Sequence, residues 1–168
     1  DHVHPQYRFF VVPQLSEWTG ISFRPAPDMS EAMQSNLPMA DVSSAMKLLA
    51  LELIRIANDF RLLSSGPTTG LNEIMLPAAQ PGSSIMPGKV NPTQNEAVTM
   101  VAAQVMGNDV AISIGGSNGH YELNVFKPLM AANFLQSARL IGDACVSFTD
   151  HCAAGIEPNY AGIKKHLE

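Results

Sequence analysis

The stretch from Gly82 to Pro92 gathers more chemically useful side chains than any other part of this 168-residue sequence. It offers two hydroxyl groups, a cation and a side-chain amide, from Ser83, Ser84, Lys89 and Asn91. Lys89 and Asn91 are two positions apart, so both can point at one carboxylate. A helix is predicted to follow directly, and a helix N-terminus favours anions. The stretch therefore predicts an anion site with a base or nucleophile beside it, although a structured loop with polar capping residues would have the same composition.

The same stretch does not fit the phosphate-binding loop G-x-x-x-x-G-K-[ST]. Five residues separate Gly82 from Gly88 where that motif has four, and Val90 follows the lysine in place of Ser or Thr. No strand pattern precedes it. We therefore exclude this class of nucleotide site.

Metal and cofactor sites are not expected elsewhere. His151 lies beside Cys152, but no second pair of ligands has the spacing of a metal site. Cys145 and Cys152 are seven positions apart, share one helix face, and read as two reduced, buried thiols. Reduced thiols fit a cytoplasmic location.

Three long helical patterns must position the stretch. Apolar residues recur at three- and four-residue steps over residues 41–63, and Asp41 or Ser43 can cap this helix. Residues 94–114 carry only two charges, which predicts a helix buried on every side. A third helical pattern runs over residues 121–151, with a kink expected at Pro128. With no alternation typical of strands, the fold class is all-α, a bundle of long helices.

The composition excludes several classes of protein. Charged residues make up 15% of the sequence and hydrophobic residues 46%, which rules out a disordered tail. The formal net charge of -5 argues against a nucleic-acid partner, which would need a basic face. Polar residues interrupt each apolar run before it reaches the roughly 20 residues that span a bilayer, so no membrane partner is expected.

Residues 82–92 closely resemble the signature G-S-S-x-M-P-x-K-x-N-P of the fumarase/aspartase superfamily, and they match it at every fixed position. The resemblance extends along the whole chain. Further similar segments are Ile56–Asp59, Ser65–Pro67, Gln104–Asp109, Glu122–Pro128, Phe134–Ser137 and Gly155–Asn159. The sequence is therefore identified as a member of this superfamily.

The resemblance implies a division of the chain. Residues 1–152 would form part of the central helical-bundle domain, with a catalytic loop at residues 80–93. Residues 153–168 would begin a small C-terminal domain, and the family's N-terminal domain would be absent from the chain. Family active sites combine three segments from different subunits of a homotetramer. This chain would supply one of them, so the chain alone is expected to be inactive.

The resemblance also implies roles for individual residues. Ser83 would be the general base, while Lys89 and Asn91, with Ser84 beside them, would bind the substrate carboxylate. Glu96 matches a glutamate that pairs with a histidine from another segment, although a carboxylate in a first helical turn is also favoured by the helix dipole alone. His120 reads as a loop histidine. No cofactor is implied.

Family members eliminate water or an amine from small dicarboxylates to leave fumarate. The sequence downstream of the loop is more similar to class II fumarases, which favours reversible elimination of water from L-malate. Upstream, the segments Arg61–Pro67 and Leu71–Ile74 are more similar to aspartate ammonia-lyase, which keeps L-aspartate open as the substrate. A non-catalytic structural relative is a third alternative.

Overall fold

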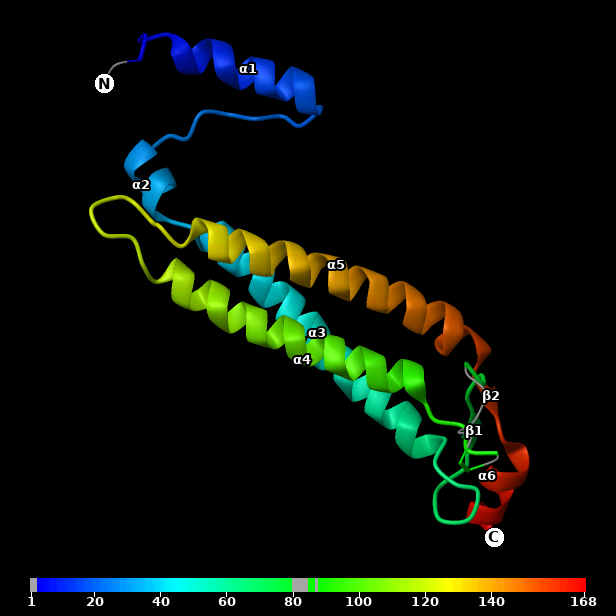
Figure 1. Ribbon diagram of the computed structural model, residues 1–168. Coiled ribbons are helices and arrows are strands. Elements are labelled where there is room, and N and C mark those ends of the chain that lie inside the picture. The colour runs from blue at the N-terminus through cyan, green and yellow to red at the C-terminus, as the bar shows by residue number, and fades with distance from the viewer. Residues whose placement is uncertain (1–2, 80–84, 87) are drawn as a thin grey trace.

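The computed structural model describes residues 3–79, 85–86 and 88–168, and its main body is an elongated bundle of three helices (Figure 1). These are α3 (Leu37–Leu63), α4 (Thr93–Gly116) and α5 (Lys127–His151). The shorter helices are α1 (Tyr7–Thr19), α2 (Met29–Gln34), α6 (Tyr160–Leu167) and a 3-10 turn, η1 (Ala153–Gly155). The predicted all-α bundle is confirmed.

Two very short strands were not expected from the sequence. β1 (Ile74–Met75) and β2 (Glu157–Pro158) pair in antiparallel register at the end of the bundle where α6 lies. They join the connection after α3 to the segment after α5. At the opposite end of the chain, α1 buries none of its residues and lies apart from the bundle (Figure 1).

The core of the bundle is built from small and medium side chains on α4 and its two neighbours. One cluster joins Ala50 of α3 with Ala102 and Val105 of α4 and with Ile141 of α5. A second cluster, nearer the β1–β2 end, contains Ala57, Val98, Phe148 and Cys152. Fully buried alanines on α3 let α4 approach it closely, and α4 also packs along α5.

The start of α3 differs from the prediction. The helix begins at Leu37, before the expected first residues, because Pro38 is tolerated in a first helical turn. Neither Asp41 nor Ser43 caps it. Ser43 lies inside the helix with its side chain buried. The capping prediction was therefore wrong.

The start of α5 also differs. The prediction placed residues 121–126 in the helix, but Tyr121 and Glu122 have φ values of 50° and 65°, outside the helical region. The helix begins at Lys127, which places Pro128 in its first turn. No kink is needed there, because a proline in a first turn removes no helical hydrogen bond.

Helix α4 is buried on one face only within this chain. Its buried residues follow one stripe, while Met100, Val110 and Ile114 on the opposite side are 67%, 58% and 56% exposed. The prediction of burial on every side was therefore wrong for the chain by itself.

Among the described residues, α4 is the one helix long and apolar enough by length and composition to cross a membrane. Its buried Asn95, Asn108 and Asp109 instead bind neighbouring helices, which is typical of a core helix.

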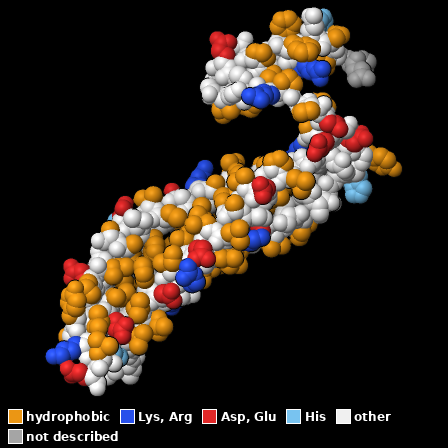
Figure 2. Space-filling model, turned by 180° about the vertical axis from the view of Figure 1, so that it is seen from behind, with side chains coloured by type: hydrophobic (Ala, Val, Ile, Leu, Met, Phe, Trp, Pro, Cys, Tyr) orange, Lys and Arg blue, Asp and Glu red, His pale blue; other side chains and the backbone are white. Residues whose placement is uncertain are grey.

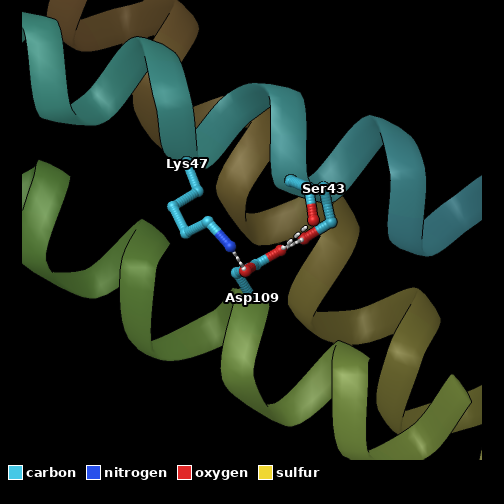
Figure 3. A network of polar contacts seen from close by, with 4 residues as sticks. Ser43, Lys47 and Asp109 are labelled. Atoms are coloured by element: carbon cyan, nitrogen blue, oxygen red, sulfur yellow. Dashed lines mark hydrogen bonds and ion pairs between the residues drawn. The ribbon is translucent and has the colours of Figure 1, made fainter. Parts of the chain in front are cut away.

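A polar network in the middle of the bundle joins α3 to α4 (Figure 3). The Asp109 side chain is 3% exposed, and its Oδ2 accepts a hydrogen bond and ion pair from Lys47 Nζ at 2.6 Å. Its Oδ1 accepts from Ser43 Oγ at 2.8 Å and from Ser44 Oγ at 3.4 Å. Burial by itself raises the pKa of Asp109, but hydrogen bonds from Lys47 and Ser43 and the Lys47 charge outweigh burial and hold the pKa below its usual value.

We expect Lys47→Met to destabilise the protein most at neutral pH. A carboxyl group whose native pKa is depressed stabilises the fold above its unfolded pKa, and this stability is lost as pH falls through the native pKa. The variant should lose about 1–3 kcal/mol at neutral pH, less than a fully buried pair would cost because Lys47 is partly exposed. The measurement is urea unfolding of both proteins at neutral and at acidic pH.

The matched control is Lys164→Met, which removes an exposed ion pair with Glu168 at 3.6 Å. It should change the free energy of unfolding by less than about 1 kcal/mol at either pH. A Lys47→Met loss that stays the same size in acid would contradict this account of Asp109.

Candidate functional site

A cavity of about 880 Å³ opens where α3 ends and α4 begins, and we call it the site cavity. The C-terminal end of α3, the connection that includes β1 and the start of α4 form its walls. Its polar lining side chains are Asn58, Arg61, Ser64, Ser65, Asn72, Lys89, Asn91 and Glu96. Two of these are cations and three are amides, so the described walls suit an anion with several oxygen atoms.

The site cavity brings together three of the residues that the sequence predicted. Lys89 and Asn91 line it from the loop before α4, and Glu96 lines it from the first turn of α4. Lys89 and Asn91 are exposed and Glu96 is half-buried. Within the described part of the chain, these three side chains make no hydrogen bond or ion pair with one another or with their neighbours. No described residue therefore competes with a ligand for their charges and amide.

Two predicted site residues, Ser83 and Ser84, lie outside the described residues. The described part of the loop has two backbone hydrogen bonds close to α4. The Lys89 amide donates to the Met86 carbonyl at 3.2 Å, and the Thr93 amide donates to the Asn91 carbonyl at 2.8 Å. These turns carry the chain directly from the loop into α4.

Five further polar residues of the site cavity were not predicted from the sequence: Asn58, Arg61, Ser64, Ser65 and Asn72. Asn58 and Arg61 lie one turn apart near the end of α3, and Asn58 Oδ1 accepts a hydrogen bond from Arg61 at 3.4 Å. Asn58 belongs to a segment already similar to the superfamily, so the signal was present. The apolar periodicity placed Asn58 and Arg61 within a helix and indicated no function for them.

The buried side chain of Asn95 fixes the first turn of α4. Its Nδ2 donates to the Ala57 carbonyl of α3 at 3.2 Å, and its Oδ1 accepts from the Cys152 thiol at 3.5 Å. Burial raises the pKa of Cys152, and the hydrogen bond to Asn95 lowers it by a smaller amount. Because Glu96 is the next residue, the contacts of Asn95 hold the helical turn from which Glu96 lines the site cavity.

The other predicted titratable residues are not in this cavity. His120 is exposed in the loop between α4 and α5, at the far end of the bundle, which agrees with its reading as a loop histidine (Figure 1). A helix of the length of α4, roughly 36 Å, separates that loop from the site cavity. Among the described residues, no three His, Cys, Asp or Glu side chains lie together as metal ligands.

Comparison with known proteins confirms the superfamily resemblance. A family model described as "Lyase" matches residues 2–107. The mitochondrial fumarate hydratase of Schizosaccharomyces pombe is 58% identical over 157 residues, which cover 94% of this chain and 30% of that protein. The class II fumarate hydratase of Pasteurella multocida is 56% identical over 162 residues, covering 96% of this chain and 35% of that protein.

A solved structure agrees with the fold. The class II fumarase of Schistosoma mansoni superposes with a TM-score of 0.91 and 37% identity, over 98% of this chain and 37% of that one. The chain spans about a third of the length of the curated relatives it matches.

We expect Asn95→Ala to lower the free energy of unfolding by about 1–3 kcal/mol, because it removes two buried hydrogen bonds and leaves a small cavity. Chemical denaturation measures the change. The matched control is Asn133→Ala, which removes an amide that bonds the Leu129 carbonyl within the same helix at 2.8 Å, and which should cost less than about 1 kcal/mol. Equal losses in the two variants would contradict the anchoring role of Asn95.

Proposed function

Because the chain belongs to the lyase family whose model matches residues 2–107, we propose that the whole protein eliminates water from L-malate to give fumarate, and adds it back. One observation carries most of the proposal. Lys89, Asn91 and Glu96 line one cavity, in a chain that is 58% identical to a fumarate hydratase. The substrate is thus a small dicarboxylate.

Lys89 and Asn91 are proposed to bind the substrate carboxylate next to the carbon that loses its proton. Removal of that proton moves negative charge onto the carboxylate oxygens, which become an aci-carboxylate. Preorganised donors aimed at developing charge are usually the largest single contribution to catalysis. Loss of one such donor typically costs on the order of 100- to 1,000-fold in turnover. The lack of competing partners for either side chain among the described residues supports this role.

Ser83 is proposed as the base, and Ser84 as a neighbouring substrate contact, on their match to the superfamily signature. In the elimination, the Ser83 alkoxide takes the proton and becomes a hydroxyl, and the carbon–hydrogen electron pair becomes the double bond. The carbon–oxygen bond breaks, and the leaving hydroxide takes a proton from solvent or from an acidic group of the assembled site and departs as water. A serine hydroxyl is only weakly acidic, so the site must stabilise the serine alkoxide for Ser83 to act as a base. Nearby cations and backbone N–H groups can do so, and Lys89 is close to Ser83 in sequence.

Glu96 is proposed to orient a histidine that another segment supplies. Its carboxylate is half-buried and unpaired among the described residues, while still in the first turn of α4, where the helix dipole favours it. A carboxylate that accepts from a histidine fixes the orientation of the ring. The proposed elimination is acid–base chemistry throughout, so it calls for no metal or redox cofactor.

We propose a homotetramer whose subunits share active sites. The bundle surface supports this proposal, because hydrophobic side chains cover much of its exposed area (Figure 2). Large exposed apolar residues lie on all three long helices: Leu48, Leu62, Met100, Val110, Leu135 and Val146. Apolar surface on this scale marks an interface more often than a water-facing surface.

The division of the chain into a helical-bundle domain at residues 1–152 and the start of a C-terminal domain at residues 153–168 remains a prediction.

The cytoplasmic location also remains a prediction. Both cysteines are free in the structure, and Cys152 is buried. The relatives include bacterial class II enzymes and mitochondrial proteins at similar identity. A nucleic-acid partner is not proposed, because the net charge is -5.

We expect the full-length protein to form fumarate from L-malate, read as an increase in ultraviolet absorbance, and to do so faster than from L-aspartate. Both substrates should be offered side by side. The 168-residue chain alone should be inactive, because its cavity would lack the segments supplied by other parts of the tetramer. Faster turnover of L-aspartate would make the protein an ammonia-lyase, and no turnover of either substrate would favour the structural relative.

We expect Ser83→Ala to lower kcat by several orders of magnitude with little change in KM, because the proton acceptor is lost while the carboxylate contacts remain. Steady-state kinetics on L-malate measure both values. Ser117→Ala is the matched control, since the Ser117 hydroxyl donates to the Ile114 carbonyl at the far end of α4 and should leave both values unchanged. Near-normal kcat in Ser83→Ala would remove Ser83 as the base.

A further inference from the structure

One wall of the site cavity is a short stretch of chain with little regular structure. Asn72, Ile74, Met75, Leu76 and Pro77 line the cavity from this stretch. Only the two residues of β1 are regular, and Asn72 has a φ of 50° in the left-handed region. Such a stretch makes few local hydrogen bonds of its own, so neighbouring elements must fix its position.

The end of α3 holds this wall from one side. The Asn72 amide donates to the Ser65 carbonyl at 2.7 Å, and the Glu73 amide donates to the Leu63 carbonyl at 2.8 Å. These bonds use the N–H groups of Asn72 and Glu73. The carbonyl groups of the same two residues accept hydrogen bonds from the C-terminal segment.

The C-terminal segment holds the wall from the other side, and Asn159 makes the contacts (Figure 1 shows β1, β2 and α6 together). Its backbone N–H donates to the Glu73 carbonyl at 2.8 Å, and its side-chain Nδ2 donates to the Asn72 carbonyl at 2.8 Å. Its Oδ1 accepts from the Gly162 amide at 3.3 Å and caps α6. Just before it, β2 pairs with β1.

The packing at this point is tight. A Cβ atom on Gly162 would lie 2.2 Å from the Asn72 carbonyl oxygen. The first turn of α6 therefore packs directly against the carbonyl that Asn159 binds. Asn159 does not itself line the site cavity. Any effect it has on the site must pass through Asn72 and Glu73.

We propose that Asn159 is a positioning residue for the active site, and that through it the C-terminal segment sets the position of the cavity wall at residues 72–77. The kinetic part of this proposal rests on the proposed function. The Asn159 side chain makes two kinds of contact: Oδ1 caps α6, and Nδ2 donates to the Asn72 carbonyl of the wall. A substitution that keeps the acceptor and removes the donor tests the second contact alone.

Asn159→Asp separates the two contacts. A carboxylate keeps the acceptor that caps α6, and Asp caps helices as well as Asn does. The carboxylate has no N–H to donate, so the bond to the Asn72 carbonyl is lost and two oxygens face each other. We expect kcat/KM for L-malate in the full-length protein to fall about 10- to 100-fold, since a small displacement of site groups costs up to about that much.

Lower pH should reduce the loss of kcat/KM in Asn159→Asp. A protonated carboxyl group donates one O–H, so it can restore the bond to the Asn72 carbonyl. The ratio of wild-type to variant kcat/KM should therefore be smaller at about pH 4 than at about pH 8, near and well above the usual Asp pKa. Hydrogen exchange of residues 71–78, measured by mass spectrometry, should be faster in the variant.

Asn118→Asp is the matched control. It makes the same chemical change where Asn118 Nδ2 donates to the Ile114 carbonyl at 2.7 Å, at the far end of the bundle. It should alter neither kcat/KM nor exchange of residues 71–78. If Asn159→Asp has wild-type kcat/KM, Asn159 is only a helix cap and the proposal is overturned.

A failure of the proposed function can be told apart from a failure of this inference. If the wild-type full-length protein turns over neither L-malate, fumarate nor L-aspartate, the proposed function fails. Hydrogen exchange then decides the inference by itself. Faster exchange of residues 71–78 in Asn159→Asp supports the role of Asn159 in holding the wall, and unchanged exchange overturns it.

Discussion

The placement of α4 between α3 and α5 is the constraint on which the rest of the structure depends. Apolar packing along a helix allows some sliding and rotation, but buried polar groups allow little, because each unpaired group costs free energy. Asn95 bonds α3 and Cys152 at the start of α4, and Asp109 bonds Lys47 and Ser43 further along. These contacts fix α4 along its axis and in rotation.

Polar contacts between α4 and α5 also fix the position of α4. Asn108 Nδ2 donates to Gln136 Oε1 at 2.9 Å and to Ser137 Oγ at 3.0 Å. At the end of the helix, Asn124 Nδ2 donates to the Gly115 carbonyl at 2.9 Å and holds the turn toward α5. Since Glu96 lies in the first turn of α4 and Asn91 just before the helix, these bonds position the α4 side of the site cavity. Buried contacts inside the bundle thus help to set the position of the site residues on α4.

The low content of charge has a structural explanation. With 15% charged residues, the chain has too few to cover an elongated bundle, and large apolar side chains remain exposed on all three long helices. The same chain leaves Lys89 and Asn91 exposed at an open cavity. Both observations agree with the proposed tetramer, in which other subunits would cover the helices and complete the site.

The sequence by itself determined the helical bundle and the residues of the loop before α4. Spacing of apolar residues depends only on helical geometry, so α3, α4 and α5 were predicted with errors confined to their ends. Those errors arose at Pro38 and Pro128, where a proline fits a first turn as well as it breaks a helix. Lys89, Asn91 and Glu96 were predicted because they lie in or next to a specific signature, and the structure places all three at one cavity.

Only the tertiary structure decided how distant segments meet. Asn58 and Arg61 reach the site cavity from α3, and Asn159 binds Asn72 across 87 positions of sequence. No local pattern marks such contacts, because each depends on the packing of whole helices rather than on the residues beside it. Ser43 shows the same limit: its type suited a helix cap, and its buried partner Asp109, 66 residues away, gave it another role.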